Sequence, residues 1–152
     1  GLGDVYKRQI MAAAVGDFRP VEQAQEKIKK NGRVNIDLRL TSNPDILAWA
    51  GEHKTADQTL CGFAMETQDL EANAAKKLVS KHCSMLVANN LNTPGAGFAV
   101  DTNVVTVLKP GETTDEPIIE HWNKMGKQEL AERILTELAA LRNTESAESQ
   151  AS

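Results

Sequence analysis

The apolar positions of this chain follow two patterns, which alternate along the sequence. Residues 10–15, 59–64 and 85–88 form short, mainly apolar runs, which are typical of strands buried within a parallel sheet. Residues 34–40 alternate apolar and polar side chains, and this period predicts a half-buried strand. Residues 103–108 are rich in β-branched side chains and predict another strand.

Three further segments, near residues 43–53, 69–81 and 127–142, carry the signals of helices. The first starts with residues that suit a cap, a first helical position and an acidic partner of the helix dipole: Asn43, Pro44 and Asp45. The other two place apolar side chains on one face: Leu70, Ala74 and Leu78, and Leu130, Ile134 and Leu138. Strands alternating with helices predict an α/β layer fold with a largely parallel sheet.

Four segments lack these patterns. Residues 22–33 are polar and lysine-rich, and we expect a surface loop or flap there. Residues 90–98 predict a second loop because they contain proline and glycines. Residues 1–9 are unlike the rest of the chain and are interpreted as a foreign or misjoined leader, with a genuine N-terminal arm as the alternative. Residues 143–152 are polar and predict a disordered tail.

Length and charge exclude several classes of protein. A chain of 152 residues is long enough for one domain with a core. The formal net charge of -4 argues against a protein that grips nucleic acid through its overall field. No apolar run approaches the roughly 20 residues of a membrane span, so we expect a cytoplasmic protein without membrane contact. Cys61 and Cys83 are interpreted as reduced, buried thiols, and three histidines as surface residues: His53, His82 and His121.

Ligands of α/β folds bind beyond the carboxyl ends of the strands, which directs attention to the loops after Ala14, Ala64 and Asn89. Asp17 could accept hydrogen bonds from ribose hydroxyls or help to hold a metal, or it could simply form a turn. A lysine cluster, Lys27 with Lys29 and Lys30, suits a phosphorylated ligand, and a solvated charge run is the alternative.

Three more features admit both a binding and a structural interpretation. The helix start at residues 43–46 offers free N–H groups to a ligand, or is capped internally. Lys77 and Lys81 lie one helical turn apart and could clamp a polyphosphate, or lie on an exposed face. Phe63 ends a strand and could pack on a base or ribose, or in the core. The chain has no Gly-rich phosphate fingerprint.

Several short blocks follow one another in a distinctive order: residues 12–20, 26–30, 43–46, 62–67 and 87–89, and Gly97-Phe98 with Asp101 and Asn103. This order, over residues 10–142, closely resembles the synthetase domain of the bacterial bifunctional phosphopantothenoylcysteine synthetase/decarboxylase family. The resemblance implies a Rossmann-like three-layer domain that is incomplete at its N-terminus, because the family's first strand, Gly-rich turn and neighbouring elements have no counterpart here. It therefore implies a fragment that is poorly stable or inactive alone.

The resemblance also implies a two-step ligation in coenzyme A biosynthesis. The carboxylate of 4′-phosphopantothenate attacks CTP to give an acyl-cytidylate and pyrophosphate, and the amine of L-cysteine then displaces CMP. Magnesium is expected to accompany the CTP, and FMN belongs to the decarboxylase domain, which is absent here. A homodimer through the synthetase domain is expected. A lysine-bearing flap would close over such a site and exclude water.

The family's functional positions carry over residue by residue. Lys27 matches the flap lysine and is the expected catalytic residue. The positions expected to bind CTP are Met11, Ala12, Ala13, Asp17, Lys27, Asn43, Pro44, Asp45, Ile46, Phe63, Lys77 and Lys81. Ala14 matches a position that binds the acyl intermediate; the metal ligands stay unknown. The chain departs from the family at Gly16 and Met65, where alanine is common, and at Asn90, which replaces an aspartate.

Two other functions remain open at this point. One is a non-catalytic module that binds a nucleotide or only mediates dimerisation. The other is an NAD(P)-dependent oxidoreductase on a similar fold, against which the missing dinucleotide fingerprint argues. Substitution of Lys27 separates the ligase from the non-catalytic module, because loss of ligation with CTP binding retained supports the enzyme.

Overall fold

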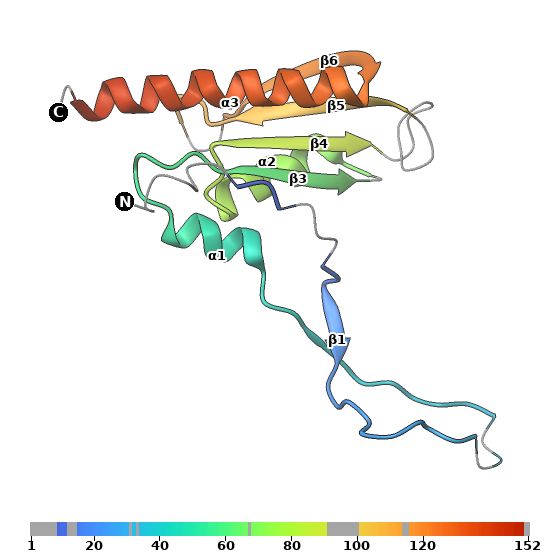
Figure 1. The fold of residues 1–152 in the computed structure, drawn as a ribbon. Coiled ribbons are helices and arrows are strands. Elements are labelled where there is room, and N and C mark those ends of the chain that lie inside the picture. The colour runs from blue at the N-terminus through green and yellow to red at the C-terminus, as the bar shows by residue number, and fades with distance from the viewer. Residues whose placement is uncertain are drawn as a thin grey trace. The chain divides into compact units, whose positions relative to one another are not determined.

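A computed structural model describes residues 9–11, 15–30, 32, 34–66, 68–90, 101–113 and 116–150. The chain divides into two compact units, Gly1–Asp45 and Ile46–Ser152, and each is described by itself. The elements follow the order β1, β2, α1, β3, α2, β4, β5, β6 and α3 (Figure 1).

The first unit contains a two-stranded antiparallel ribbon. Its strands are β1, Phe18–Pro20, and β2, Leu40–Ser42, with Phe18 opposite Ser42 and Pro20 opposite Leu40. Val21 N donates to the carbonyl of Arg39 at 3.0 Å just beyond the paired residues. The described residues between the two strands form no helix or strand, so the ribbon carries a long irregular arm, as expected for the flap over residues 22–33 (Figure 1). Asn31 and Arg33 lie outside the described residues.

Two strands predicted in this unit are wrong where the structure describes them. The strand over residues 34–40 is paired only at its last residue, and Val34 is 95% exposed. Its alternation would give a half-buried strand only if one face packed on a core, and here both faces are exposed. Of the strand over residues 10–15, Ile10, Met11 and Val15 are exposed and belong to no strand, while 12–14 lie outside the described residues.

The second unit is built on a four-stranded sheet with the order β3-β4-β5-β6. Its strands are β3, Cys61–Glu66; β4, Met85–Asn90; β5, Thr102–Lys109; and β6, Ile118–Gly126. β3 and β4 pair in parallel and are connected by a helix, whereas β4–β5 and β5–β6 pair antiparallel. The predicted α/β class is confirmed. The sheet is mixed, since β3, β4 and β6 run in one direction and β5 runs in the other.

Helices cover both faces of this sheet, as predicted for a three-layer fold. α3, Lys127–Gln150, packs on one face, and α2, Leu70–Ser80, packs on the other together with Leu47 of α1, Ile46–His53 (Figure 1). Side chains on successive strand residues point to opposite faces. Met85 and Val87 therefore face α3, while Leu86 and Ala88 face α2.

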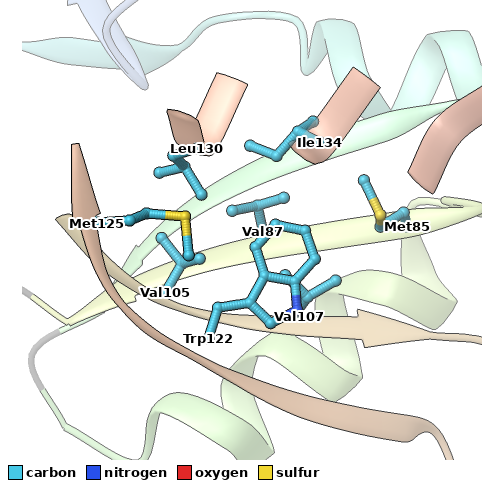
Figure 2. Close-up of a cluster of buried hydrophobic side chains, with 8 residues drawn as sticks. All are labelled: Met85, Val87, Val105, Val107, Trp122, Met125, Leu130 and Ile134. Carbon is cyan, nitrogen blue, oxygen red and sulfur yellow. The ribbon is translucent and has the colours of Figure 1, made fainter. Parts of the chain in front are cut away.

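The two faces hold separate hydrophobic clusters. Figure 2 shows Leu130 and Ile134 of α3 pointing toward the strand side chains of the first: Met85, Val87, Val105, Val107, Trp122 and Met125. The second cluster joins strand and helix residues on the opposite face: Ala64, Leu86, Ala88, Leu108, Ala74, Leu78 and Cys83. The apolar stripes predicted for α2 and α3 thus lie against the sheet, which confirms both helices.

The C-terminal part of the chain differs from expectation in two ways. No strand was predicted at 118–126, yet β6 forms an edge of the sheet there. α3 continues to Gln150, so the prediction of a disordered tail is wrong for residues 143–150. Glutamate, alanine and glutamine favour helix, and adding residues to an existing helix avoids the unfavourable nucleation step. No helix among the described residues is long and apolar enough to cross a lipid bilayer.

Candidate functional site

Asp17 and Asn43, two of the predicted CTP-binding residues, meet at the base of the ribbon. Asn43 N donates to the Asp17 carbonyl at 2.8 Å, and Asn43 Nδ2 donates to the Gly16 carbonyl at 2.6 Å. Asn43 Oδ1 accepts from a guanidinium nitrogen of Arg19 at 3.0 Å. The predicted cap on α1 is therefore wrong, because both ends of the Asn43 amide are engaged within the ribbon.

Arg19 is a site residue that sequence reasoning missed. Its guanidinium donates to the Ser42 carbonyl at 2.7 Å as well as to Asn43. It thus fixes the orientation of the Asn43 amide and crosses from β1 to the end of β2. The only signal in the sequence was its place in the Gly16–Pro20 turn. An arginine at such a place does not by itself indicate a link between two strands.

Lys27, the expected catalytic residue, lies on the exposed arm beyond the ribbon. Lys29 and Lys30 are exposed on the same segment, and none of the three is in a helix or strand. Three cationic side chains on one irregular segment produce a locally positive arm on a chain whose net charge is -4. Such an arm can attract a polyphosphate even though the whole protein repels one.

The start of α1 differs by two residues from its prediction. The helix begins at Ile46, so Pro44 precedes it and does not occupy the first helical position, while Asp45 directly flanks the helix. Proline disfavours a helical conformation at the preceding residue, which agrees with the position of Asn43 outside α1. Asn43, Pro44 and Asp45 thus belong to the first unit, and Ile46, which is exposed, opens the second.

Phe63 lies on β3, an edge strand of the sheet as described, and its side chain is 69% exposed. The alternative of core packing for Phe63 is therefore wrong. Met65, two residues on, points to the same face and is also exposed. The prediction that Phe63 ends a strand is wrong, because β3 continues to Glu66. The exposed aromatic ring of Phe63 is still available to stack on a planar ligand.

Glu66 ends β3 and holds Lys77, another predicted CTP-binding residue. Lys77 Nζ lies 2.6 Å from Glu66 Oε1. Asn73 Nδ2 lies 3.4 Å from Glu66 Oε2 and donates to the Gln68 carbonyl at 3.1 Å. The contacts join the end of β3 to the body of α2, and bring one of the two predicted clamp lysines to the carboxyl edge of the sheet.

Lys81 lies at the opposite end of α2 from the helix start. It is the C-cap residue, and its backbone N–H donates to the carbonyls of Lys77 and Val79.

Asn89 lies near the end of β4, and its Oδ1 is buried with no hydrogen-bond partner among the described residues. Asn89 opposes Met65 in the parallel ladder, so this carboxamide lies one strand inward from β3.

The remaining predicted positions divide between exposed and undescribed residues. Met11 is exposed. Ala12, Ala13 and Ala14 lie outside the described residues, as do residues 91–98 of the loop predicted over 90–98; Asn90 itself ends β4. The structure therefore joins Asp17 with Asn43 in the first unit and Lys77 with the end of β3 in the second.

Cys61, also on β3, has no properties of a nucleophile. Burial, reinforced by the neighbouring Cys83 thiol, raises the pKa of Cys61 to about 12. A thiol with that pKa is protonated at neutral pH, and only the thiolate reacts. Both cysteines are reduced thiols, and Cys83 is buried, as predicted; Cys61 is only partly so. The three histidines are exposed, as expected.

A pocket of about 410 Å³ lies away from these residues, between the end of α2 and the turn that joins β5 to β6. Lys54, Val79, His82, Gly111 and Pro117 are among its lining residues. None of the predicted CTP-binding residues lines it.

The sequence and the fold of this chain are similar to those of known proteins. The family model described as "DNA/pantothenate metabolism flavoprotein C-terminal domain" matches residues 4–141. The match includes nearly all of the described secondary structure. It also begins inside residues 1–9, the segment interpreted above as a leader that does not match.

Two curated relatives cover most of this chain. A coenzyme A biosynthesis bifunctional protein CoaBC of Bacillus subtilis (strain 168) is 43% identical over 134 residues, which are 87% of this chain and 31% of that protein. A cysteine/cysteine sulfinic acid decarboxylase from an unknown prokaryotic organism is 44% identical over 108 residues, 70% of this chain and 30% of that protein. The chain thus spans about a third of the length of these relatives.

A solved structure shares the fold. The crystal structure of the C-terminal domain of a coenzyme A biosynthesis bifunctional protein CoaBC has a TM-score of 0.60 and 30% sequence identity to this chain. The similarity covers 86% of this chain and 53% of that domain. These values support a Rossmann-like arrangement for the α/β layers described above.

Proposed function

This chain belongs to the family of DNA/pantothenate metabolism flavoprotein C-terminal domains, and on that premise we propose that it forms part of a ligase of coenzyme A biosynthesis. The ligase joins 4′-phosphopantothenate to L-cysteine and consumes CTP. The observation that carries the proposal is the meeting of Asp17 and Asn43 at the base of an arm that bears Lys27. The CoaBC relative, which is named as a coenzyme A biosynthesis protein, supports the same pathway.

The proposed chemistry proceeds in two steps. A carboxylate oxygen of 4′-phosphopantothenate attacks the α-phosphorus of CTP, the bond to the β-phosphate oxygen breaks, and pyrophosphate leaves. The neutral amine of cysteine then attacks the acyl carbon of the resulting acyl-cytidylate, loses a proton, and expels CMP as the amide forms. Activation is required because a carboxylate oxygen is too poor a leaving group for direct attack by an amine.

In the first step, Lys27 stabilises the negative charge that grows on the oxygens of the transferring phosphorus. An ammonium suits this role because it is a compact charge on a flexible stem, and electrostatic stabilisation of developing charge is a large term in catalysis. The exposed arm gives the Lys27 side chain freedom to reach a bound triphosphate. Lys29 and Lys30 raise the local positive potential and aid capture of CTP.

The other residues bind and orient the nucleotide. The Asp17 carboxylate accepts hydrogen bonds from ribose hydroxyls, and its backbone is fixed to Asn43 at 2.8 Å. Phe63, exposed on β3, packs on a planar part of the ligand. Lys77, held at the carboxyl end of β3, offers its ammonium group to the phosphates. Holding two reactants in a fixed geometry supplies a substantial part of the rate enhancement of a ligation.

Magnesium fits this chain as an ion carried by the triphosphate. Among the described residues, no three His, Cys, Asp or Glu side chains gather as a metal site would require. Mg²⁺ bound to a nucleotide needs few protein ligands, because phosphate oxygens and water fill most of its six positions. When bound, the ion would neutralise phosphate charge; the roles of Lys27 and Lys77 do not depend on it.

The proposal is tested by substituting Lys27 in the intact protein and following pyrophosphate and 4′-phosphopantothenoylcysteine. We expect Lys27→Ala to lower kcat by roughly 10²–10³-fold, as for the loss of one preorganised donor to a transition state. CTP should still bind. Lys30→Ala is the matched control, since it removes a charge from the same arm and should change kcat less than about threefold.

Two outcomes would reject the ligase. One is an intact protein that forms no amide from CTP, phosphopantothenate and cysteine but still binds CTP, which supports a non-catalytic nucleotide-binding or dimerisation module. The other is release of CO₂ from cysteine without nucleotide, the activity for which the second relative is named. Unchanged kcat in Lys27→Ala would remove Lys27 from the chemistry even if the wild-type protein is a ligase.

A further inference from the structure

The ion pair between Glu66 and Lys77 is asymmetric in its exposure. The Glu66 side chain is only 13% exposed, whereas the Lys77 side chain is 46% exposed. Glu66 Oε1 accepts from Lys77 and Oε2 from Asn73, so both carboxylate oxygens are directed at α2. The carboxylate is enclosed by its partners, while the ammonium retains an open side.

An ammonium has three N–H donors, and the 2.6 Å contact with Glu66 uses one of them. The exposure of Lys77 leaves space for an acceptor oxygen at the others. A contact of this length is charge-assisted, and such hydrogen bonds are roughly twice as strong as neutral ones. The pair therefore fixes the position of Nζ without enclosing it.

Glu66 also sets the direction of the Lys77 side chain. Lys77 lies about two turns into α2, and side chains on a helix lean toward its N-terminus. That lean carries the ammonium toward the carboxyl end of β3, where Glu66 is the last strand residue. Without Glu66, the four-carbon stem has many rotamers, and most of them take Nζ away from the strand end.

We propose that Glu66 is a positioning residue for the nucleotide: it holds the Lys77 ammonium at the carboxyl end of β3 so that its remaining donors face the triphosphate. This inference rests on the proposed function. The rival interpretation is purely structural, with Glu66 only tying β3 to α2. The two interpretations predict different results when the Glu66 carboxylate is removed and the protein remains folded. Only the positioning role predicts weaker CTP binding.

The test compares Glu66→Ala, Glu66→Gln, Lys77→Ala and the double variant in the intact protein, with KM for CTP and kcat measured separately. Glu66→Ala should raise KM for CTP roughly tenfold while kcat at saturating CTP changes less than about twofold. Glu66→Gln still offers an acceptor oxygen and should raise KM by only about threefold. Glu52→Ala, an exposed glutamate on α1, is the matched control and should leave KM unchanged.

The double variant separates positioning from a structural link. If Glu66 acts through Lys77, Glu66→Ala combined with Lys77→Ala should raise KM no more than Lys77→Ala alone. If the effects of the two substitutions on KM multiply, or if Glu66→Ala leaves KM unchanged, the positioning role of Glu66 is overturned. Neither result contradicts the proposed ligase function. A wild-type protein that forms no product overturns the proposed function instead. Urea unfolding of each variant shows that the compared proteins are folded, and a KM change confined to unfolded variants counts against positioning.

Discussion

Asn43 Nδ2 donates to the carbonyl of Gly16 across 2.6 Å, so one side chain links the two segments that enter and leave the arm. The same amide accepts from Arg19 through its oxygen. The described part of the ribbon has no buried face, and a two-stranded ribbon of this kind is marginal by itself. The base of the arm therefore depends on polar links more than on packing.

Replacing Asn43 with alanine should loosen the base of the arm. The change removes both side-chain links, each worth about 1 kcal/mol, and leaves the backbone bond to Asp17 in place. We expect the amide of Asn43 to exchange with solvent roughly tenfold faster, as measured by hydrogen-exchange NMR. Asn35→Ala, on the exposed part of the same arm, should leave that rate unchanged; equal protection in both variants would contradict the role given to Asn43.

Glu120 should make the stability of the second unit depend on acid pH. Lys109 donates to Glu120 Oε1 at 2.8 Å and Trp122 Nε1 donates to Oε2 at 3.0 Å. The bond from Lys109, then that from Trp122, lowers the pKa of Glu120. A carboxyl whose folded pKa is lowered contributes stability above its unfolded pKa, and this contribution is lost as the pH falls through the folded value.

Lys109 adds the opposite dependence at alkaline pH. Burial alone would lower the pKa of Lys109, but its hydrogen bonds to Glu120 and Glu137 outweigh burial and raise it. Its contribution is therefore lost as the pH rises through that raised value.

The acid dependence due to Glu120 is tested by urea unfolding from pH 6 to pH 2.5. The gap in the free energy of unfolding between wild type and Glu120→Gln should close as the pH falls. A gap that is constant over this range would contradict the assignment.

Ile134 and Leu135 offer a matched pair on α3. Ile134 is 7% exposed in the core cluster, whereas its neighbour Leu135 is 52% exposed. Ile134→Ala should lower the free energy of unfolding by about 2–5 kcal/mol because it removes buried methyl groups and leaves a cavity. Leu135→Ala should change it by less than about 1 kcal/mol. Chemical denaturation of both variants measures the difference, and equal losses would show that α3 is not packed as described.

Gly51 should resist replacement by alanine. A Cβ added at Gly51 would overlap the carbonyl oxygen of Lys81 and lie 2.8 Å from its carbonyl carbon. Alanine gains up to about 1 kcal/mol in helix propensity over glycine, and the overlap with fixed backbone exceeds that gain. We expect a net loss of about 2 kcal/mol for Gly51→Ala in urea unfolding. Gly126→Ala is the control, since a Cβ at Gly126 meets nothing within 4 Å.

Much of the second unit could be predicted because its local patterns agree with its packing. The apolar face of α2 kept one helical period, the continuous apolar run over residues 85–88 indicated β4, and both are buried as expected. β6 was missed because its period is broken. Its buried residues Trp122 and Met125 lie three apart, opposite Val105 and Asn103, which lie two apart, so a register irregularity hides the alternation.

The strand over residues 34–40 was mispredicted although its period is regular. Residues 34–40 show an alternation that the structure does not use, because no core packs against either face. A period of two indicates which side chains share a face, but it does not supply a partner for that face. Only Leu40 of this segment entered a strand.

The candidate site was predictable in its residue types and less so in its contacts. Lys77 was selected with Lys81 from helical spacing, yet its partner is Glu66 on another element, eleven residues earlier. Asn43 was assigned to a helix cap, yet its amide serves the ribbon. Contacts between elements depend on how those elements are placed in space, and spacing along one helix carries no information on that placement.

The reversed direction of β5 has a consequence for the order in which the sheet assembles. β5 and β6 meet across a short connection over residues 110–117, whereas β3 and β4 require the whole of α2 between them. Closing the shorter loop loses less chain entropy, so the β5–β6 hairpin should form first. Pulse-labelled amides of β5 would then be protected before those of Phe63 and Glu66. The edge of the sheet that holds these two residues would be the last to acquire its native shape.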